Sequence, residues 1–107
     1  MAATALASIT TKEHTFDVKF HPTESFLAIA TISGRIELHN FDADAGSAEL
    51  RRSVRSHKDS CRAACFLGDD ASARLVSTSA DCFVAMADVE TGKRLWRGQL
   101  PPPRKAP

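Results

Sequence analysis

The feature that most constrains this chain is an internal repeat. His57 follows His14 by 43 positions, and the segment 27–40 aligns without gaps onto the segment 75–88. Both copies place an apolar run, a turn and an alternating run in the same order. Self-similarity at a period of about 40–45 residues marks folds that stack copies of one supersecondary unit. The chain is therefore expected to contain two copies of one unit.

The first copy shows the patterns of β-strands. Phe16, Val18 and Phe20 alternate with polar residues, which indicates a strand with one buried face. Residues 26–31 form a nearly continuous apolar run, as in a strand covered on both faces, and residues 35–39 alternate again after a tight-turn signal. A four-stranded unit with this period is typical of a β-propeller blade. We therefore predict an all-β fold with two four-stranded antiparallel sheets, which are blades of an incomplete propeller.

The repeat divides the chain into four parts. These are an N-terminal tail or closing strand at 1–13, a first blade at 14–56, a second blade at 57–100 and a Pro-rich disordered tail at 101–107. A closed propeller needs roughly four to eight blades. The chain is therefore expected to be a fragment of a larger propeller, or to receive the missing blades from another chain.

The second copy resembles a WD40 repeat. The resemblance is carried by His57, by the serine-rich segment 77–81, and by Asp88-Val89-Glu90-Thr91-Gly92. In this family a turn aspartate orients a loop histidine, which bonds a strand hydroxyl, and such a buried network is stable only when its polar groups are paired. The resemblance implies that this blade contains a structural network of His57, Ser77, Ser79, Asp81 and Asp88. Either Ser77 or Ser79 would supply the hydroxyl group that bonds the histidine. The tryptophan that usually completes the network is replaced by Ala87.

Longer stretches resemble the first two blades of the WD repeat-containing protein 55 family, whose members are nuclear and nucleolar propellers. These stretches are residues 16–22 with 33–39, and residues 57–63 with 87–92. The resemblance implies a non-enzymatic protein-interaction scaffold in ribosome biogenesis and rRNA processing, with pre-ribosomal factors as partners. The expected localisation is the nucleus and nucleolus, with the cytoplasm as the alternative.

A second function follows from the same resemblance. Some plant members of the family are linked to cullin-4 ubiquitin ligases through the adaptor DDB1, so the alternative is a substrate receptor for such a ligase. The adaptor is usually bound through a Trp-Asp-x-Arg motif, and the corresponding residues here are Ala87-Asp88-Val89-Glu90. The sequence at this site therefore does not support adaptor binding.

A third function, RNA binding, depends on basic outer strands. The chain has 14 Lys and Arg residues against 13 Asp and Glu, a formal net charge of +1 that gives no strong attraction to nucleic acid. Basic residues nevertheless gather at 51–58 and after Glu90. On the last expected strand Arg94, Trp96 and Arg97 are candidate interaction residues, because Trp and Arg are frequent in interface hot spots. The alternative for Trp96 is packing against a further blade.

Two kinds of chemical site compete with this structural interpretation. His57, Cys61 and Cys65 are spaced by four, which suits a zinc site on a helix, but residues 61–67 read as a strand on which both cysteines share one face as small packing residues. His57 and Asp81 with a serine suggest a hydrolase, but no nucleophile-elbow sequence surrounds any serine. We therefore expect no enzyme activity, metal or cofactor. The odd number of cysteines and the lack of a membrane-length apolar run predict a reducing compartment and no membrane partner.

Overall fold

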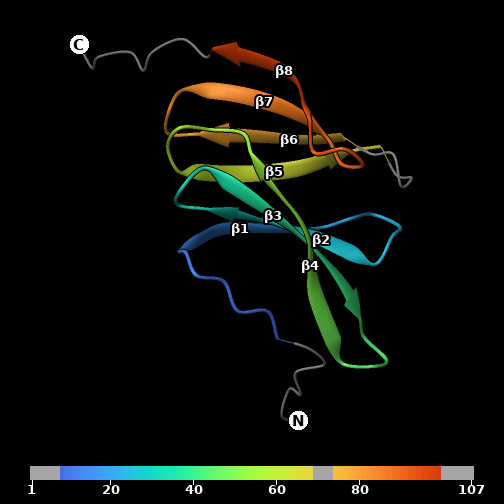
Figure 1. Cartoon of the computed structure of the whole chain (residues 1–107). Coiled ribbons are helices and arrows are strands. Elements are labelled where there is room, and N and C mark those ends of the chain that lie inside the picture. The colour runs from blue at the N-terminus through green and yellow to red at the C-terminus, as the bar shows by residue number, and fades with distance from the viewer. Residues whose placement is uncertain (1–7, 69–73, 100–107) are drawn as a thin grey trace, which may run out of the picture.

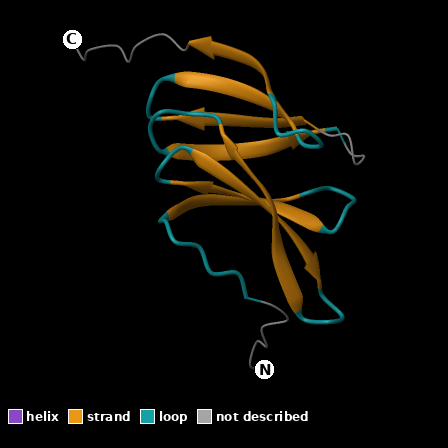
Figure 2. Cartoon of the chain, in the orientation of Figure 1, coloured by secondary structure: helices purple, strands orange, loops and turns teal. Residues whose placement is uncertain are grey.

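All regular structure in the described part of the chain is β-strand. The computed structural model describes residues 8–68 and 74–99 (Figure 1), and in Figure 2 these residues are strands joined by loops. The strands are β1 (Thr15–Phe20), β2 (Phe26–Thr31), β3 (Arg35–Asp42), β4 (Ser47–Arg55), β5 (Cys61–Leu67), β6 (Arg74–Ser79), β7 (Phe83–Asp88) and β8 (Arg94–Gln99). Among these residues no helix has the length and hydrophobicity that crossing a bilayer requires.

The strands form two antiparallel sheets in sequential order. The first sheet has the order β1-β2-β3-β4, and the second has the order β5-β6-β7-β8. Figure 1 shows the second sheet stacked on the first, with β5 packing against β1 and β2. The prediction of an all-β fold with two four-stranded antiparallel sheets is confirmed. Residues 8–13 precede β1 without forming a strand, while the tail predictions for 1–7 and 101–107 lie outside the described residues.

The core lies between the two sheets. Ile36, Leu38 and Val54 of the first sheet belong to one buried cluster with Leu75 of the second, and each of them is at most 3% exposed. Burying a large apolar side chain contributes about 1.5–3 kcal/mol, so the stacking of the sheets stabilises both of them. Alanine side chains, which end at Cβ, let the sheets approach closely at Ala28, Ala30, Ala64, Ala85 and Ala87.

The turn between β2 and β3 connects the two sheets at one end. Gly34 has a φ of 89°, a left-handed conformation that glycine adopts without strain. A Cβ on Gly34 would overlap the carbonyl oxygen of His57 and would lie 2.6 Å from that of Asp59. The Ser56 amide also donates to the Gly34 carbonyl at 3.4 Å. The glycine therefore lets the first sheet touch the segment that leads into β5.

The turn between β6 and β7 repeats this backbone shape. Cys82 follows Asp81 as Gly34 follows Ser33, and Cys82 has a φ of 67°. A non-glycine residue in this conformation is strained, because its Cβ approaches the following carbonyl oxygen. The internal repeat thus extends to the backbone conformation of the turns.

A bulge in β5 determines which face each cysteine occupies. The pairing of β5 with β6 leaves Arg62 as an extra residue between Cys61 and Ala63. Cys61 is 0% exposed in the core, while Cys65 lies on the opposite, exposed face. The prediction that both cysteines share one face is therefore wrong, because a bulge interrupts the alternation of a strand.

Candidate functional site

His57 is the centre of a buried polar network in the second sheet. Its side chain is 0% exposed, with Nε2 at 2.9 Å from the Ser77 Oγ and Nδ1 at 3.3 Å from the Asp81 Oδ2. An ionised carboxylate only accepts hydrogen bonds, so Nδ1 donates to Asp81 and Nε2 accepts from the Ser77 hydroxyl. Both ring nitrogens thus have partners, which offsets the cost of burying the imidazole.

Asp81 connects this network to the backbone on two sides. Its Oδ1 accepts from the Phe83 amide at 2.9 Å, and its Oδ2 accepts from the Lys58 amide at 3.1 Å. Burial alone would raise the pKa of Asp81, but the two amides and His57 outweigh it, so the pKa is lowered. The carboxylate is therefore ionised at neutral pH and holds the β6–β7 turn against the segment before β5.

The surroundings of His57 suit a structural role. Burial lowers the pKa of His57, and the Asp81 carboxylate opposes this only in part, so the imidazole is neutral at pH 7. Its partner Ser77 is 2% exposed. A nucleophile must reach its substrate, and the buried Ser77 hydroxyl has no such access. The His, Ser and Asp side chains therefore brace the blade.

The two serines of the predicted network have different roles. Ser77 supplies the hydroxyl that bonds His57, whereas the Ser79 Oγ donates to the Asp59 carbonyl at 3.1 Å. Ser79 also accepts from the Asp81 amide at 3.1 Å. Ser79 therefore supports the loop next to the network.

Asp88 lies at the opposite end of β7 from Asp81. Its Oδ1 accepts from the amides of Glu90 and Thr91, at 2.8 and 3.1 Å. These are the contacts of a residue that stabilises a turn through its own side chain. Asp88 thus fixes the β7–β8 turn and does not join the His57 network to which the resemblance assigned it.

The cysteines do not converge on a metal position. Burial raises the pKa of the Cys61 thiol to about 11, so the side chain stays protonated at neutral pH, whereas metal ligands and nucleophiles are thiolates. Cys65 lies on the other face of β5, away from Cys61 and His57. Across residues 8–68 and 74–99, no group of three or more His, Cys, Asp or Glu side chains is placed to hold a metal ion.

A second bulge puts Arg94 and Arg97 on the same face of the second sheet. Residues three apart in a regular strand point to opposite faces, but the pairing of β8 with β7 leaves Leu95 as an extra residue. The extra residue reverses the alternation. Both arginines lie opposite alanines of β7, Ala85 and Ala87, that are buried between the sheets. The arginines therefore face the side on which the first sheet lies.

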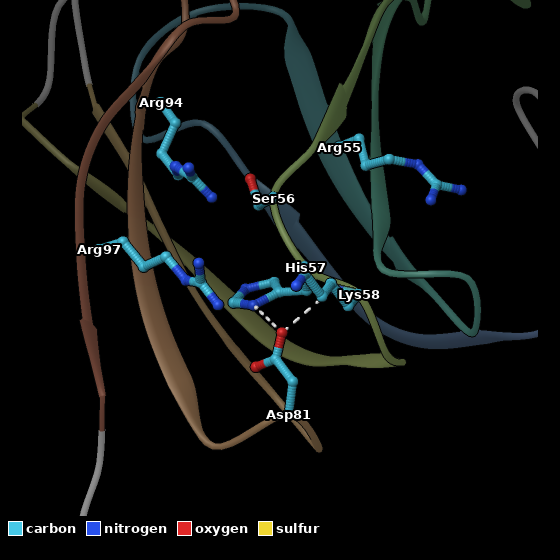
Figure 3. Close-up of a pocket in the computed structure, with 7 residues that line it drawn as sticks. All are labelled: Arg55, Ser56, His57, Lys58, Asp81, Arg94 and Arg97. Atoms are coloured by element: carbon cyan, nitrogen blue, oxygen red, sulfur yellow. Dashed lines mark hydrogen bonds and ion pairs between the residues drawn. The ribbon is translucent and has the colours of Figure 1, made fainter.

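The two arginines border an open cavity of about 150 Å³. In Figure 3 they extend from β8 toward Ser56 and His57, whereas Arg55 points away from them. The cavity is lined by Arg55, Ser56, His57, Lys58, Asp81, Arg94 and Arg97. The sequence pattern named both β8 arginines but gave no sign of Ser56, because its place depends on how the segment before β5 crosses the sheet.

Trp96 lies on the opposite face of β8, so the three candidate interaction residues are divided between two surfaces. Its side chain is 54% exposed, and its ring covers Gly98, where a Cβ would overlap it. The residues around it are mostly apolar and exposed or half-buried. This surface, which we call the open face, consists of Ala63, Cys65, Val76, Thr78, Val84, Met86 and Trp96.

Comparisons relate the chain to WD40-repeat proteins. It is 41% identical over 80 residues to WD repeat-containing protein 55 of Arabidopsis thaliana. It is 33% identical over 81 residues to the homolog of Dictyostelium discoideum, and 35% identical over 77 residues to that of Drosophila melanogaster. The alignments cover 75%, 76% and 72% of this chain, and 22%, 19% and 15% of the relatives. No protein-family model matches the chain.

The fold has a close counterpart among solved structures. The crystal structure of Saccharomyces cerevisiae Sqt1, a WD40 protein, matches 79% of this chain and 24% of its own chain with a TM-score of 0.70 at 24% identity. That match confirms that the two sheets are blades of an incomplete propeller. The chain spans less than a quarter of the length of the curated relatives it matches. The blades and these relatives identify the chain as a WD40-repeat protein that resembles the WD repeat-containing protein 55 family over its two blades.

Proposed function

We propose that the chain is part of a non-enzymatic scaffold for protein–protein interaction, and that this scaffold acts in ribosome biogenesis and rRNA processing. WD40-repeat proteins are in general scaffolds of this kind. The observation that carries the proposal is the open face of the second sheet, on which Trp96 is 54% exposed. Contiguous exposed apolar surface marks a place that another protein surface covers.

The open face suits a further blade. It is a sheet surface of apolar side chains, the same kind of surface through which the two present blades stack. A further blade of the same protein, or of another chain, would bury Trp96. The loops at the blade ends would then remain for pre-ribosomal partners.

The finer assignment follows from the family resemblance. Relatives named WD repeat-containing protein 55 match both blades, and the resemblance implies a nuclear and nucleolar protein. The nucleolus is where a ribosome-assembly factor meets its partners. We therefore propose nucleolar localisation for this chain.

Two other functions have less support. Glu90 stands at the arginine position of the adaptor motif and lies 3.7 Å from Arg51 as an ion pair, so an acid occupies the place where DDB1 binding requires a base. RNA binding by outer strands would use a row of cations along the backbone. Arg94 and Arg97 instead converge on one cavity.

The test is co-sedimentation of the tagged chain with pre-ribosomal particles. We expect the chain to sediment with the particles. Trp96→Ser should reduce this by weakening the stacking of a further blade, because the substitution removes the largest apolar group of the open face. The matched control is Leu50→Ser on β4, since Leu50 is 55% exposed on the first sheet. A chain that stays free of particles, in cells whose rRNA precursors are unchanged when it is depleted, would contradict the proposal. Fluorescence of the tagged chain outside the nucleolus would contradict the localisation.

A further inference from the structure

The cavity next to the His57 network carries an excess of positive charge. Four basic side chains line it, and Asp81 is the single acid among its lining residues. Arg55 points away from the β8 arginines (Figure 3), so with His57 neutral the three other cations less one carboxylate leave a net charge of +2. The oxygens of Asp81 are already occupied by Phe83, Lys58 and His57. A concave site of this charge attracts an anion.

The two arginines of β8 are available to a ligand. Within the described part of the chain, Arg94 and Arg97 form no hydrogen bond or ion pair through their side chains. The guanidinium carbon of Arg97 lies 3.5 Å from the centroid of the Phe83 ring. Stacking holds the guanidinium flat and leaves the N–H groups at its edge free. Arg94 extends toward Ser56, and Arg97 extends toward His57 (Figure 3).

Ser56 supplies an independent indication of a missing partner. It is 3% exposed, and its Oγ is buried without a hydrogen-bond partner in the described structure. Buried hydroxyl groups nearly always have a partner. Because Ser56 lines the cavity, an anion bound there would accept the hydrogen bond that the hydroxyl lacks.

The cavity is built entirely from the two blades. Arg94 and Arg97 face the first sheet, while Trp96 and the open face lie on the other side of the second sheet. A further blade on the open face would therefore leave the cavity accessible. The site does not depend on a third blade for its lining.

We propose that this cavity binds the phosphate monoester of a phosphorylated serine or threonine in a partner protein. A phosphate monoester presents three terminal oxygens and close to two negative charges at neutral pH, which suits two arginine forks and one hydroxyl donor. A carboxylate carries one negative charge, so it offsets less of the positive charge of the lining than a phosphate monoester does. A nucleic acid backbone needs cations spread along successive phosphates, whereas here they converge on about 150 Å³. This inference extends the proposed scaffold function. It depends on that function only in assuming that the phosphate belongs to a partner protein.

The test is an NMR titration of the purified full chain with N-acetyl-O-phosphoserine amide. We expect saturable shifts of the Lys58 amide and of the side-chain Nε–H groups of Arg94 and Arg97. Arg94→Gln and Arg97→Gln should each weaken binding about tenfold, the loss expected for one charge-assisted hydrogen bond. Ser56→Ala should also weaken it without unfolding the chain, because the hydroxyl makes no bond within the described structure. Lys93→Gln is the matched control, since it removes a neighbouring exposed charge outside the cavity.

Three results would overturn the proposal. The first is an absence of binding in a chain whose spectrum shows that it is folded. The second is binding that Arg94→Gln and Arg97→Gln leave unchanged, or that Lys93→Gln weakens equally. The third is equal binding of acetate, of N-acetylserine amide or of single-stranded oligouridylate. The titration uses one purified chain and a small probe, so its failure would leave the co-sedimentation result for the scaffold function unaffected.

Discussion

Replacing Asp81 with alanine tests how the blade is held together. The substitution removes the acceptor for the amides of Phe83 and Lys58 and for the Nδ1–H of His57. The Lys58 amide is exposed, so water replaces its lost partner at little cost. The His57 side chain is 0% exposed, and its N–H would be left buried without an acceptor.

The magnitude follows from these three bonds. A buried donor without a partner costs about 1–3 kcal/mol, and a bond from a part-buried amide to a charged group contributes about 1 kcal/mol net. We therefore expect Asp81→Ala to lower the free energy of unfolding by about 2–4 kcal/mol. Small domains are stable by about 5–15 kcal/mol, so the variant would lose a large part of its stability. Asp81→Asn keeps an acceptor oxygen and should cost about half as much.

Asp88→Ala provides the control for this experiment. Asp88 also accepts from two backbone amides through one carboxylate, but both of its bonds are exposed. Its loss should cost about 0.5–1 kcal/mol. Urea unfolding followed by far-ultraviolet circular dichroism gives the free energies, and native-state hydrogen exchange reports the Phe83 amide directly. If Asp81→Ala lowered the free energy of unfolding no more than Asp88→Ala does, the hydrogen bond to the buried His57 would not be the source of the stabilisation.

Further predictions concern the turns and the pH dependence. Gly34→Ala should lower the free energy of unfolding by about 2 kcal/mol or more, because its Cβ would overlap the His57 carbonyl at a φ of 89°; a urea midpoint equal to that of the unchanged chain would contradict this. Cys82→Gly should raise the free energy of unfolding by about 0.5–1 kcal/mol, because glycine removes the strain at a φ of 67°; a lower urea midpoint would count against it. The pKa of His57 is lowered in the fold, so the unfolded chain binds the proton first, and stability should fall as the pH drops below about 6.5. Urea midpoints measured between pH 7.5 and 5.5 report this loss of stability. If the His57→Gln variant lost the same stability over this range, a group other than His57 would be responsible.

The strands and their grouping into sheets could be predicted from the sequence. Burial in a sheet follows side-chain parity, so the alternation of Ile36 and Leu38 correctly reports a strand with one covered face. The same argument is wrong for β1, where the alternating Phe16, Val18 and Phe20 are 41%, 47% and 64% exposed. The gap-free match between the two copies then gave the same strand order twice. The order of His57, Ser77 and Asp81 along the chain matches a WD40 repeat, and the three side chains meet in the structure.

The contents of the cavity could not be predicted in this way. The alternation of side chains between the two faces of a strand is interrupted at a bulge. Arg62 in β5 and Leu95 in β8 are the extra residues of two bulges, and neither residue type indicates a bulge in a sequence. Without the bulge, Arg94 would be assigned to the face of Trp96. The Ser56 hydroxyl lacks a hydrogen-bond partner because of how the two sheets pack, which the sequence around Ser56 does not indicate.

The extra residue in β8 has a consequence for how the two surfaces can change. Because Leu95 shifts the alternation, a strand of six residues, Arg94–Gln99, presents cations on one side and a tryptophan on the other. Substitutions at Arg94 or Arg97 alter ligand choice while leaving blade stacking intact, and substitutions at Trp96 do the reverse. If β8 kept Leu95 but lost the bulge, regular alternation would place Arg94 on the face of Trp96, and a guanidinium would then lie in the stacking interface. The extra residue thus allows the cavity and the open face, which share the strand β8, to change independently of each other in evolution.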